Sequence, residues 1–258
     1  MKIGTYNVLG LRGYPPEEAA NAIGEPGEDS NSAHFAKVFT QLNCDILALQ
    51  EGVTVRTMQQ IARQMDRYLA TFPSPLNWPG HILSRYPILE SRTFSHADPR
   101  EKTPPFSRTS GAALLAIDAD TTLWVVDVHL HPSDVDLRIR ESDILQERIE
   151  TIQSVTSNII VLGDFNSKID ERVHQNLKAM NFVNAMETVG GGLQITTDTF
   201  VGRGKSSLDH IYVGPSWAPN LQSATVIRDS GFRHDGPQET GIYVHSDHLP
   251  VAAQLTWP

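Results

Sequence analysis

The sequence predicts one α/β domain, and three observations carry this prediction. Strand-like runs rich in branched residues recur along all 258 residues, and helix-like segments lie between them. Some of the strand-like runs, notably 45–49 and 158–163, are apolar without alternation, which is typical of strands covered on both faces. No repeat and no shift in composition marks a boundary, so we expect a single domain over residues 1–258.

The individual elements follow from local patterns. Branched, apolar runs predict strands at 2–8, 45–50, 80–86, 88–94, 111–118, 121–130, 158–165, 208–213, 223–229 and 251–257. Apolar residues at helical spacing predict helices at 31–43, 54–66, 133–157 and 170–180. The longest helix is expected to begin at a capping box, Ser133 with Asp136, and to have one apolar face: Leu145, Ile149, Ile152 and Val155. Two Gly- and Pro-containing segments, 10–32 and 95–109, predict long loops that are either functional or tolerated insertions.

Composition narrows the class of protein. Hydrophobic residues make up 40% of the chain, which is enough for a sizeable core. The net charge of −9 argues mildly against a tight or processive DNA binder, although it leaves room for a local basic groove. The single cysteine, Cys44, allows no internal disulfide and no cysteine-based zinc site, and we expect it to be buried as a small apolar residue. No apolar run reaches the ~20 residues of a membrane span and no signal peptide is visible, so a cytoplasmic protein is expected.

Polar side chains gather where the predicted strands begin or end. They are Asn7, Glu51, His129, His131, Asp164, Asn166, Asp209, His210, Ser246, Asp247 and His248. Taken alone, an Asp or Asn after a strand is more often a turn residue than a ligand. Carboxylates, amides and imidazoles without a thiolate suit Mg²⁺, with Mn²⁺ and Ca²⁺ as alternatives. Magnesium typically takes one or two carboxylates, and Glu51 with Asp247 would meet that demand.

The order of these motifs resembles the endonuclease/exonuclease/phosphatase superfamily, which is also called DNase I-like. The resemblance covers essentially the whole chain, through "TYNVLG", "LALQE", "ILSRYPI", "VVDVHLH", "VLGDFNS", "SSLDHIYV" and "HSDHLPV". It implies a four-layer α/β sandwich, in which two mixed sheets pack face to face with helices outside and the catalytic residues gather at one rim. That architecture agrees with the interleaved, doubly covered strands.

The resemblance also implies a metal site. Glu51 looks like the principal metal carboxylate, Asn7 is similar to the amide that supports it, and Asp247 looks like a further acidic ligand that acts directly or through water.

The catalytic roles implied by the resemblance fall on five residues. His248 looks like the histidine that activates or orients the attacking water, and Asp209 is similar to the acid that holds its imidazole. Asp164 and Asn166 resemble the pair that contacts the nucleophile and the scissile phosphate. His129 resembles the histidine that binds phosphate or protonates the leaving group.

Several other residues have two interpretations each. Arg108 could reach a phosphate or be an ordinary surface arginine, and Phe200 and Arg203 either contact the group attached to the phosphate or have no such role. His210 is expected to have a structural place beside the site, and His131 a supporting or surface position.

Three hypotheses about function follow. The first is a divalent-metal-dependent hydrolase of phosphate esters, a phosphodiesterase or phosphatase acting on a small or lipid-derived substrate as a monomer. The alternative is a nuclease that cleaves DNA or RNA with the same site, which the segment 10–32 disfavours because it has one arginine against five acidic residues. An inactive binding module ranks last, because His248, Glu51 and Asp209 are all retained.

Overall fold

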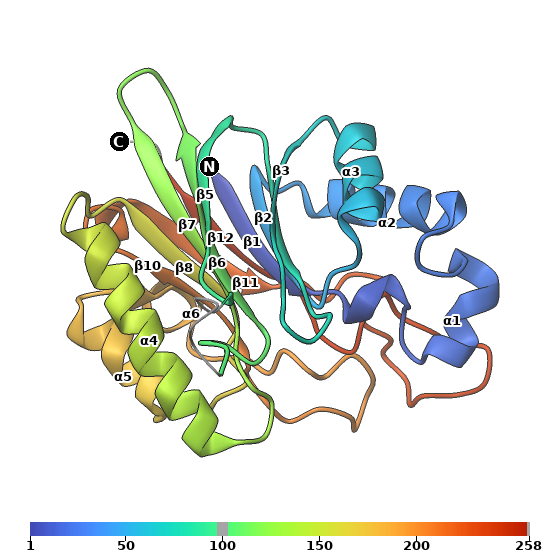
Figure 1. The fold of residues 1–258 in the computed structure, drawn as a ribbon. Helices are drawn as coiled ribbons and strands as arrows, with labels where there is room; N and C mark the ends of the chain where they lie inside the picture. The colour runs from blue at the N-terminus through green and yellow to red at the C-terminus, as the bar shows by residue number, and fades with distance from the viewer. Residues whose placement is uncertain (97–102, 257–258) are drawn as a thin grey trace.

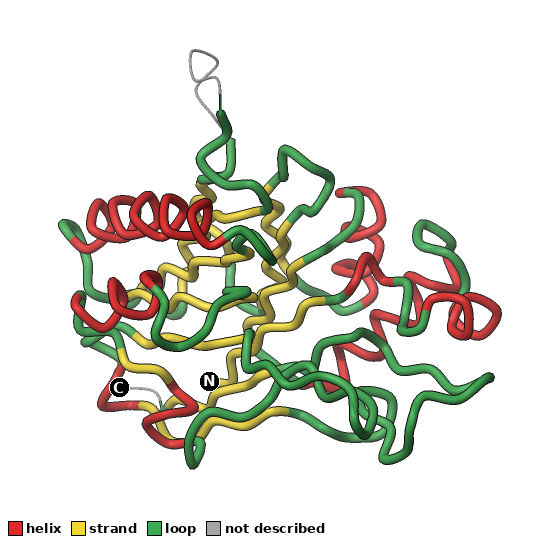
Figure 2. Tube along the Cα trace, turned by 90° about the horizontal axis from the view of Figure 1, so that it is seen from below, coloured by secondary structure: helices red, strands yellow, loops and turns green. Residues whose placement is uncertain are grey.

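Two mixed sheets pack face to face at the centre of the molecule. The computed structural model describes residues 1–96 and 103–256 (Figures 1 and 2). The first sheet has the order β11 (Leu221–Val226), β12 (Val251–Leu255), β1 (Lys2–Asn7), β2 (Ile46–Gln50), β4 (Gly80–Ser84) and β3 (Tyr68–Phe72). The second has the order β5 (Ile88–Thr93), β6 (Thr109–Ala116), β7 (Thr122–His129), β8 (Ile159–Asp164), β10 (Asp209–Val213) and β9 (Val183–Asn184).

Helices form the two outer layers (Figure 1). On the side of the first sheet lie α1 (Pro16–Ile23), α2 (Asp29–Leu42) and α3 (Val55–Gln64). The second sheet is covered by α4 (Val135–Gln153) and α5 (Arg172–Ala179). Three short helices complete the described chain: η1 (Leu9–Leu11), α6 (Ala185–Val189) and η2 (Ala218–Asn220). The predicted four-layer α/β sandwich is therefore confirmed.

Strand register explains why distant polar residues meet at one rim. In the second sheet His129 of β7 lies opposite Asp164 of β8, which in turn lies opposite Asp209 of β10. In the first sheet Asn7 of β1 lies opposite Gln50 of β2. Because β1, β2, β7 and β8 all run toward this rim, their last residues gather at a single edge of the sandwich.

The buried apolar residues form two clusters. One fills the space between the sheets and continues beneath α2 and α3, and the other lies between the second sheet and its helices, where Leu145, Ile149 and Ile152 of α4 are buried. The expectation for Val155 was wrong: it is 86% exposed, because α4 ends at Gln153 and the chain turns away. Cys44 is buried as expected, and burial raises the pKa of its thiol to about 12.

Other local expectations also need correction. The segment 10–32 contains α1 and the start of α2, since Pro16 and the two following glutamates suit a first helical turn. The N-cap of α4 is Asp134, whose side chain accepts a hydrogen bond from the Leu137 amide, in place of Ser133. Strands β3 and β9 were not predicted, and part of the expected loop 95–109 falls outside the described residues.

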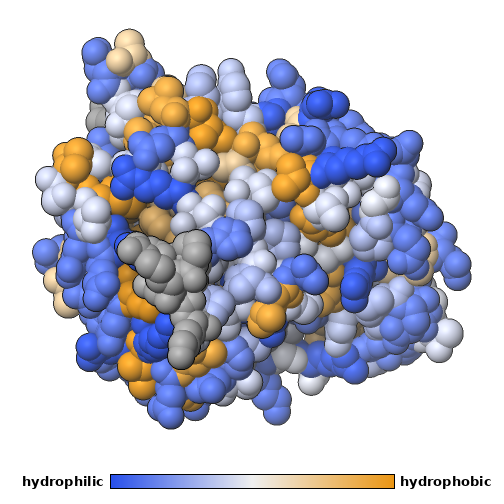
Figure 3. Space-filling view, in the orientation of Figure 1, coloured by the Kyte–Doolittle hydropathy of each residue, from blue (hydrophilic) through white to orange (hydrophobic). Residues whose placement is uncertain are grey.

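The face of the molecule in Figure 3 is mostly hydrophilic and carries several hydrophobic patches. Among residues 1–96 and 103–256, none of the helices combines the length and the apolar character that a membrane span needs.

Candidate active site

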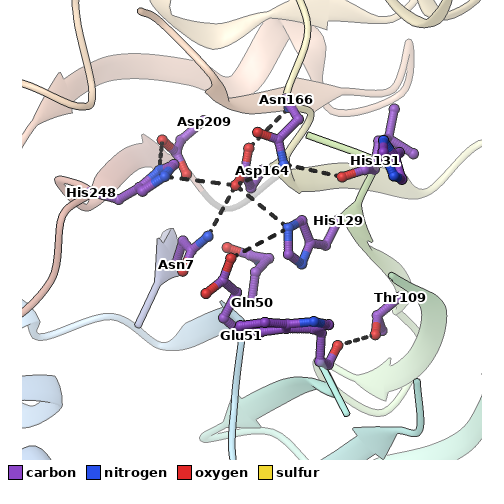
Figure 4. A network of polar contacts seen from close by, with 12 residues as sticks. Asn7, Gln50, Glu51, Thr109, His129, His131, Asp164, Asn166, Asp209 and His248 are labelled. Carbon is purple, nitrogen blue, oxygen red and sulfur yellow. Dashed lines mark hydrogen bonds and ion pairs between the residues drawn. The ribbon is translucent and has the colours of Figure 1, made fainter. Parts of the chain in front are cut away.

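The carboxylate of Asp164 lies at the centre of a polar network at the rim (Figure 4). Its Oδ1 accepts a hydrogen bond from the backbone amide of Asn166 (2.9 Å), and its Oδ2 accepts one from the side-chain amide of Asn7 (3.0 Å). The Asn166 side chain also donates to Oδ2 at 3.3 Å and to the Leu130 carbonyl at 3.1 Å. One buried carboxylate therefore joins the ends of both sheets.

The turn that carries Asp164 depends on its neighbours. A Cβ on Gly163 would lie 1.9 Å from the Val128 carbonyl oxygen, so this position has no room for a side chain. Asn166 adopts a φ of 47°, a left-handed conformation that asparagine tolerates better than most residues. Phe165 is fully buried beneath the turn. These requirements explain the local sequence "GDFN" and aim both polar side chains toward the rim.

A histidine and a second aspartate face Asp164. His248 Nδ1 lies 2.8 Å from Asp209 Oδ2, and since a carboxylate only accepts, Nδ1 carries the hydrogen. The other ring nitrogen, Nε2, lies 3.9 Å from Asp164 Oδ2. Asp209 holds the tautomer and orientation of the ring, an arrangement suited to general acid–base chemistry.

The charges in this group shift its proton affinities. Burial lowers the pKa of His248, but the charges of Asp209, Asp164 and Asp247 outweigh burial and raise the pKa well above 6.5. Burial and the charge of Asp209 raise the pKa of Asp164 to about 7, against the opposing effect of His248. Raised pKa values of neighbouring buried groups, as at Asp164 and His248, are typical of functional sites.

His129 lies between two carboxylates. Its Nε2 is 3.8 Å from Glu51 Oε1 and 3.8 Å from Asp164 Oδ2. Burial, followed by the positive charge of Arg108, lowers the pKa of His129 to about 3, so the imidazole is neutral. A neutral ring at this place can donate one hydrogen bond without adding charge.

Glu51 is the residue that directly follows β2 of the first sheet at the rim. It follows β2 with a φ of 52°, and its side chain is 18% exposed. Burial raises its pKa and the negative charge of Asp247 adds to this effect, whereas a hydrogen bond from Asn7 lowers it. The amide of Gly10 donates to the Glu51 carbonyl at 2.7 Å, which fixes the backbone at this strained position.

A buried histidine packs against the two residues that follow Glu51 along the chain. His81 of β4 is fully buried, and a Cβ on Gly52 would lie 2.2 Å from its ring. Its Nε2 lies 3.1 Å from the Val53 carbonyl, which can only accept, so Nε2 donates and Nδ1 accepts from Thr71 (3.0 Å). Burial lowers the pKa of His81 to about 4, which agrees with this neutral tautomer.

A second buried network lies beneath the rim. Asp127 of β7 accepts a hydrogen bond from the Gln50 side chain at 2.6 Å, and Gln50 accepts one from Thr5 at 3.1 Å. Burial raises the pKa of Asp127 well above 3.8, so this carboxyl favours its neutral form. The network crosses from one sheet to the other directly below Glu51, and only the fold reveals it.

The remaining candidates differ in position. The Arg108 guanidinium lies 5.0 Å from the centre of the Trp78 ring, and its charge lowers the pKa of both Glu51 and His129, so it is beside the site. Arg203 stacks on Tyr14 at 5.6 Å and hydrogen-bonds to its hydroxyl. Phe200 is fully buried, so its ring packs beneath Tyr14 and presents no surface to a substrate.

The two additional histidines have structural contacts. His210 is buried and bonds to the Asn184 side chain and the Ser207 carbonyl, as the structural interpretation requires. His131 Nδ1 accepts hydrogen bonds from the amides of Ser133 and Asp134, just before α4.

One buried group of side chains at the rim could hold a metal ion. Ligand atoms of Asp164, Asp209 and His248 all lie within 4.8 Å of one another, close enough to hold one. Outside this group, the negative charge of Asp247 raises the pKa of Glu51.

Comparisons with known proteins identify the family and the fold. A sequence model of the endonuclease/exonuclease/phosphatase family matches residues 4–230. A mannosyl-6-phosphatase from Bacteroides thetaiotaomicron has 17% identity and a TM-score of 0.71, with 100% of each chain covered. The 3′ phosphatase NExo from Neisseria, solved with a product DNA hairpin, has 20% identity, a TM-score of 0.70 and full coverage of both chains.

The catalytic domain of human Nocturnin, solved with a bound sulfate anion, has 17% identity and a TM-score of 0.70; 99% of this chain and 94% of that chain are covered. A comparison with curated protein sequences finds no significant match. Identities this low show a shared fold, whereas the family model spans most of the chain. The chain therefore belongs to the endonuclease/exonuclease/phosphatase family.

Proposed function

We propose that the protein is a divalent-metal-dependent hydrolase of small phosphate esters that uses a water molecule activated by His248. The observation that carries this proposal is the arrangement of His248 between two buried aspartates, with Nδ1 bound to Asp209 and Nε2 directed toward Asp164. Because Nδ1 already carries a hydrogen, Nε2 is the nitrogen that can take a proton from water. Family membership supports the reaction class.

The chemical step follows from these positions. Water attacks phosphorus and its proton passes to His248 Nε2. The P–O bond to the organic group breaks, the departing oxygen takes up a proton from solvent so that an alcohol leaves, and His248 returns its proton to solvent. Asp164 orients the water, and the side-chain amides of Asn166 and Asn7 hold its carboxylate in place. Neutral His129 supplies a further hydrogen bond to the phosphate or to the departing oxygen.

We assign the cation to Glu51, with Asn7 and Asp247 in support. The test of fit is the raised pKa of Glu51: burial and the neighbouring charge of Asp247 oppose its ionisation, and a positive ion would relieve both effects. Within the group Asp164, Asp209 and His248, the Asp209 carboxylate is already paired with His248 Nδ1, and both oxygens of Asp164 accept hydrogen bonds. Oxygen ligands favour Mg²⁺, with Mn²⁺ or Ca²⁺ as substitutes. Such a cation stabilises the negative charge that develops on the phosphate oxygens.

Charge favours a small substrate over a polynucleotide. The net charge is −9, and the exposed residues Glu25, Glu28 and Asp29 lie next to the rim segment that contains Pro26 and Gly27. A long polyanion would be repelled there. The similar structures include both a sugar phosphatase and a DNA 3′ phosphatase, so the fold accommodates either class.

Metal-dependent hydrolysis of a substrate panel tests the proposal. The panel contains sugar phosphates, inositol phosphates, sphingomyelin, a chromogenic phosphodiester, a short RNA and supercoiled plasmid, and each is assayed with Mg²⁺ and with chelator. We expect turnover of the small esters that requires the cation and disappears in His248→Ala. Cleavage of plasmid or RNA alone would instead favour the nuclease. Turnover by His248→Ala at the wild-type rate would refute the mechanism.

A further inference from the structure

A cavity of about 620 Å³ lies beside Glu51 and has no part in the reaction described above. Four segments form its walls: η1 with the following arginine, the connection between α1 and α2, the turn into α3, and the connection between β3 and β4. The residues that line it are Leu9, Gly10, Arg12, Pro26, Gly27, Gly52, Val53, Thr54, Thr57, Leu76, Asn77, Trp78 and Pro79. Its volume falls within the range of small-molecule sites.

Hydrogen bonds connect the residues that line the cavity to Asn7 and Glu51. The amide of Leu9 donates to the side-chain oxygen of Asn7 at 3.1 Å, and the amide of Gly10 donates to the Glu51 carbonyl at 2.7 Å. The amide of Gly52 donates to the Pro79 carbonyl at 2.9 Å. The walls are therefore fixed by the same backbone that positions Asn7 and Glu51, so a group bound here lies next to the phosphate.

The lining has the chemistry of a ring-binding site. Leu9, Val53, Leu76 and Trp78 provide apolar surface, and Arg12 is the charged side chain among the lining residues. The half-buried Trp78 ring is held by the Arg108 guanidinium, 5.0 Å from its centre. Arg108 in turn is close enough to the catalytic residues to lower the pKa of Glu51 and His129, which links this aromatic surface to the phosphate position.

We propose that this cavity binds one flat, uncharged ring of the organic group esterified to the phosphate, with Trp78 as the stacking surface. The inference rests on the phosphoesterase function proposed above. Stacking on an aromatic side chain needs only a flat face, which a heterocyclic base or the apolar side of a sugar ring provides. The acidic residues around Pro26 disfavour a continuing polynucleotide, so the ring belongs to a small ester.

Binding of two non-hydrolysable probes tests the inference without depending on turnover. Phenylphosphonate and methylphosphonate differ by the ring, and their affinities are measured by calorimetry with Mg²⁺ present. We expect the wild-type protein to bind phenylphosphonate about tenfold more tightly than methylphosphonate, given the usual strength of base–aromatic stacking. Trp78→Ala should remove most of this preference, and Trp78→Phe should retain it.

A second pair of variants covers the case in which Trp78→Ala does not fold. Leu76 and Leu89 are both 58% exposed leucines, but only Leu76 lines the cavity. Leu76→Ala should reduce the phenylphosphonate preference about two- to threefold, whereas Leu89→Ala should leave it unchanged. An equal effect of the two variants would overturn the inference.

The possible outcomes separate the two proposals. A wild-type protein that binds both phosphonates equally, or a preference that survives in Trp78→Ala, would overturn the ring site while leaving the hydrolase proposal intact. A Trp78-dependent preference without hydrolysis of any panel substrate would uphold the ring site and count against the hydrolase. Adenosine 5′-monophosphate and glucose 6-phosphate identify the source of the ring, and failure of both to bind through Trp78 would also overturn the inference.

Discussion

Removing the charge of Asp209 is the sharpest way to perturb the proposed base. In Asp209→Asn the side-chain oxygen can still accept from His248 Nδ1, which now lies 2.8 Å from a carboxylate oxygen. The change therefore removes the negative charge but preserves the geometry. A hydrogen bond to a charged group contributes about 1.5–3 kcal/mol, and this contribution grows in importance when the imidazole takes up a proton. Converted at 1.36 kcal/mol per tenfold, kcat should fall by about 10- to 150-fold.

The pH dependence of kcat/KM gives a second, independent readout. Asp209 is the largest of the charges that raise the pKa of His248 above 6.5. A base must be unprotonated to act, so the rising limb of the wild-type profile should lie above pH 6.5. Without the Asp209 charge the pKa of His248 is lower, and the limb should move toward lower pH as the plateau falls.

The assay measures kcat and kcat/KM of wild type, Asp209→Asn and a control between pH 5 and 10, with one substrate of the panel that the wild type hydrolyses. Asp235→Asn is the matched control, because Asp235 is 91% exposed and pairs with Arg233 on the surface. Its profile should coincide with wild type. An Asp209→Asn enzyme within about threefold of wild type, with an unmoved rising limb, would refute the role assigned to the pair.

Three further predictions concern residues around the site. Glu51→Gln should raise the Mg²⁺ concentration needed for half-maximal activity at least about tenfold, while the exposed-site control Glu90→Gln should not; an unchanged requirement would place the cation elsewhere. Because the pKa of Asp127 is raised, the wild type should lose the stabilising neutral form of this carboxyl as pH rises from 5 to 8, at a slope of at most about 1.4 kcal/mol per pH unit. Asp127→Asn cannot lose it, so its free energy of unfolding, measured by chemical denaturation, should change less with pH and should exceed that of wild type increasingly as pH rises. Gly52→Ala should lower the free energy of unfolding by about 1–3 kcal/mol, because the new Cβ would lie 2.2 Å from the His81 ring; equal denaturation midpoints would contradict this packing.

The rim could be predicted from the sequence because its polar residues stand at the ends of strands that pair with one another. Asn7, Asp164 and Asp209 stand at the ends of recognisable strands, and parallel or antiparallel pairing then brings such ends together. The helix α1 was missed because Gly and Pro around it resemble a loop, while the favourable first turn at Pro16 is a weak signal. Helical spacing alone placed Val155 on the apolar face of α4. It is exposed because the helix ends before it, and tertiary packing, which local patterns do not show, sets where a helix ends.

Supporting residues are harder to find from sequence. His81 and Gly52 are far apart along the chain, and their contact exists only because β2 and β4 pair. The bond between Gln50 and Asp127 crosses from one sheet to the other, so no local pattern signals it. The sequence left two interpretations of Phe200 open, and its burial depends on Tyr14 and His234, which lie in distant loops. Such side chains require the three-dimensional arrangement.

Hydrolysis of a phosphodiester in ¹⁸O-labelled water, catalysed by wild type and by His248→Ala with Mg²⁺ present, tests the central claim most directly. If water activated at His248 attacks phosphorus, the phosphoryl product should gain one labelled oxygen, the alcohol should gain none, and His248→Ala should form almost no labelled product. Label in the alcohol would mean that the C–O bond breaks, and equal labelling by His248→Ala would mean that this histidine does not activate the water. Either result would contradict the account.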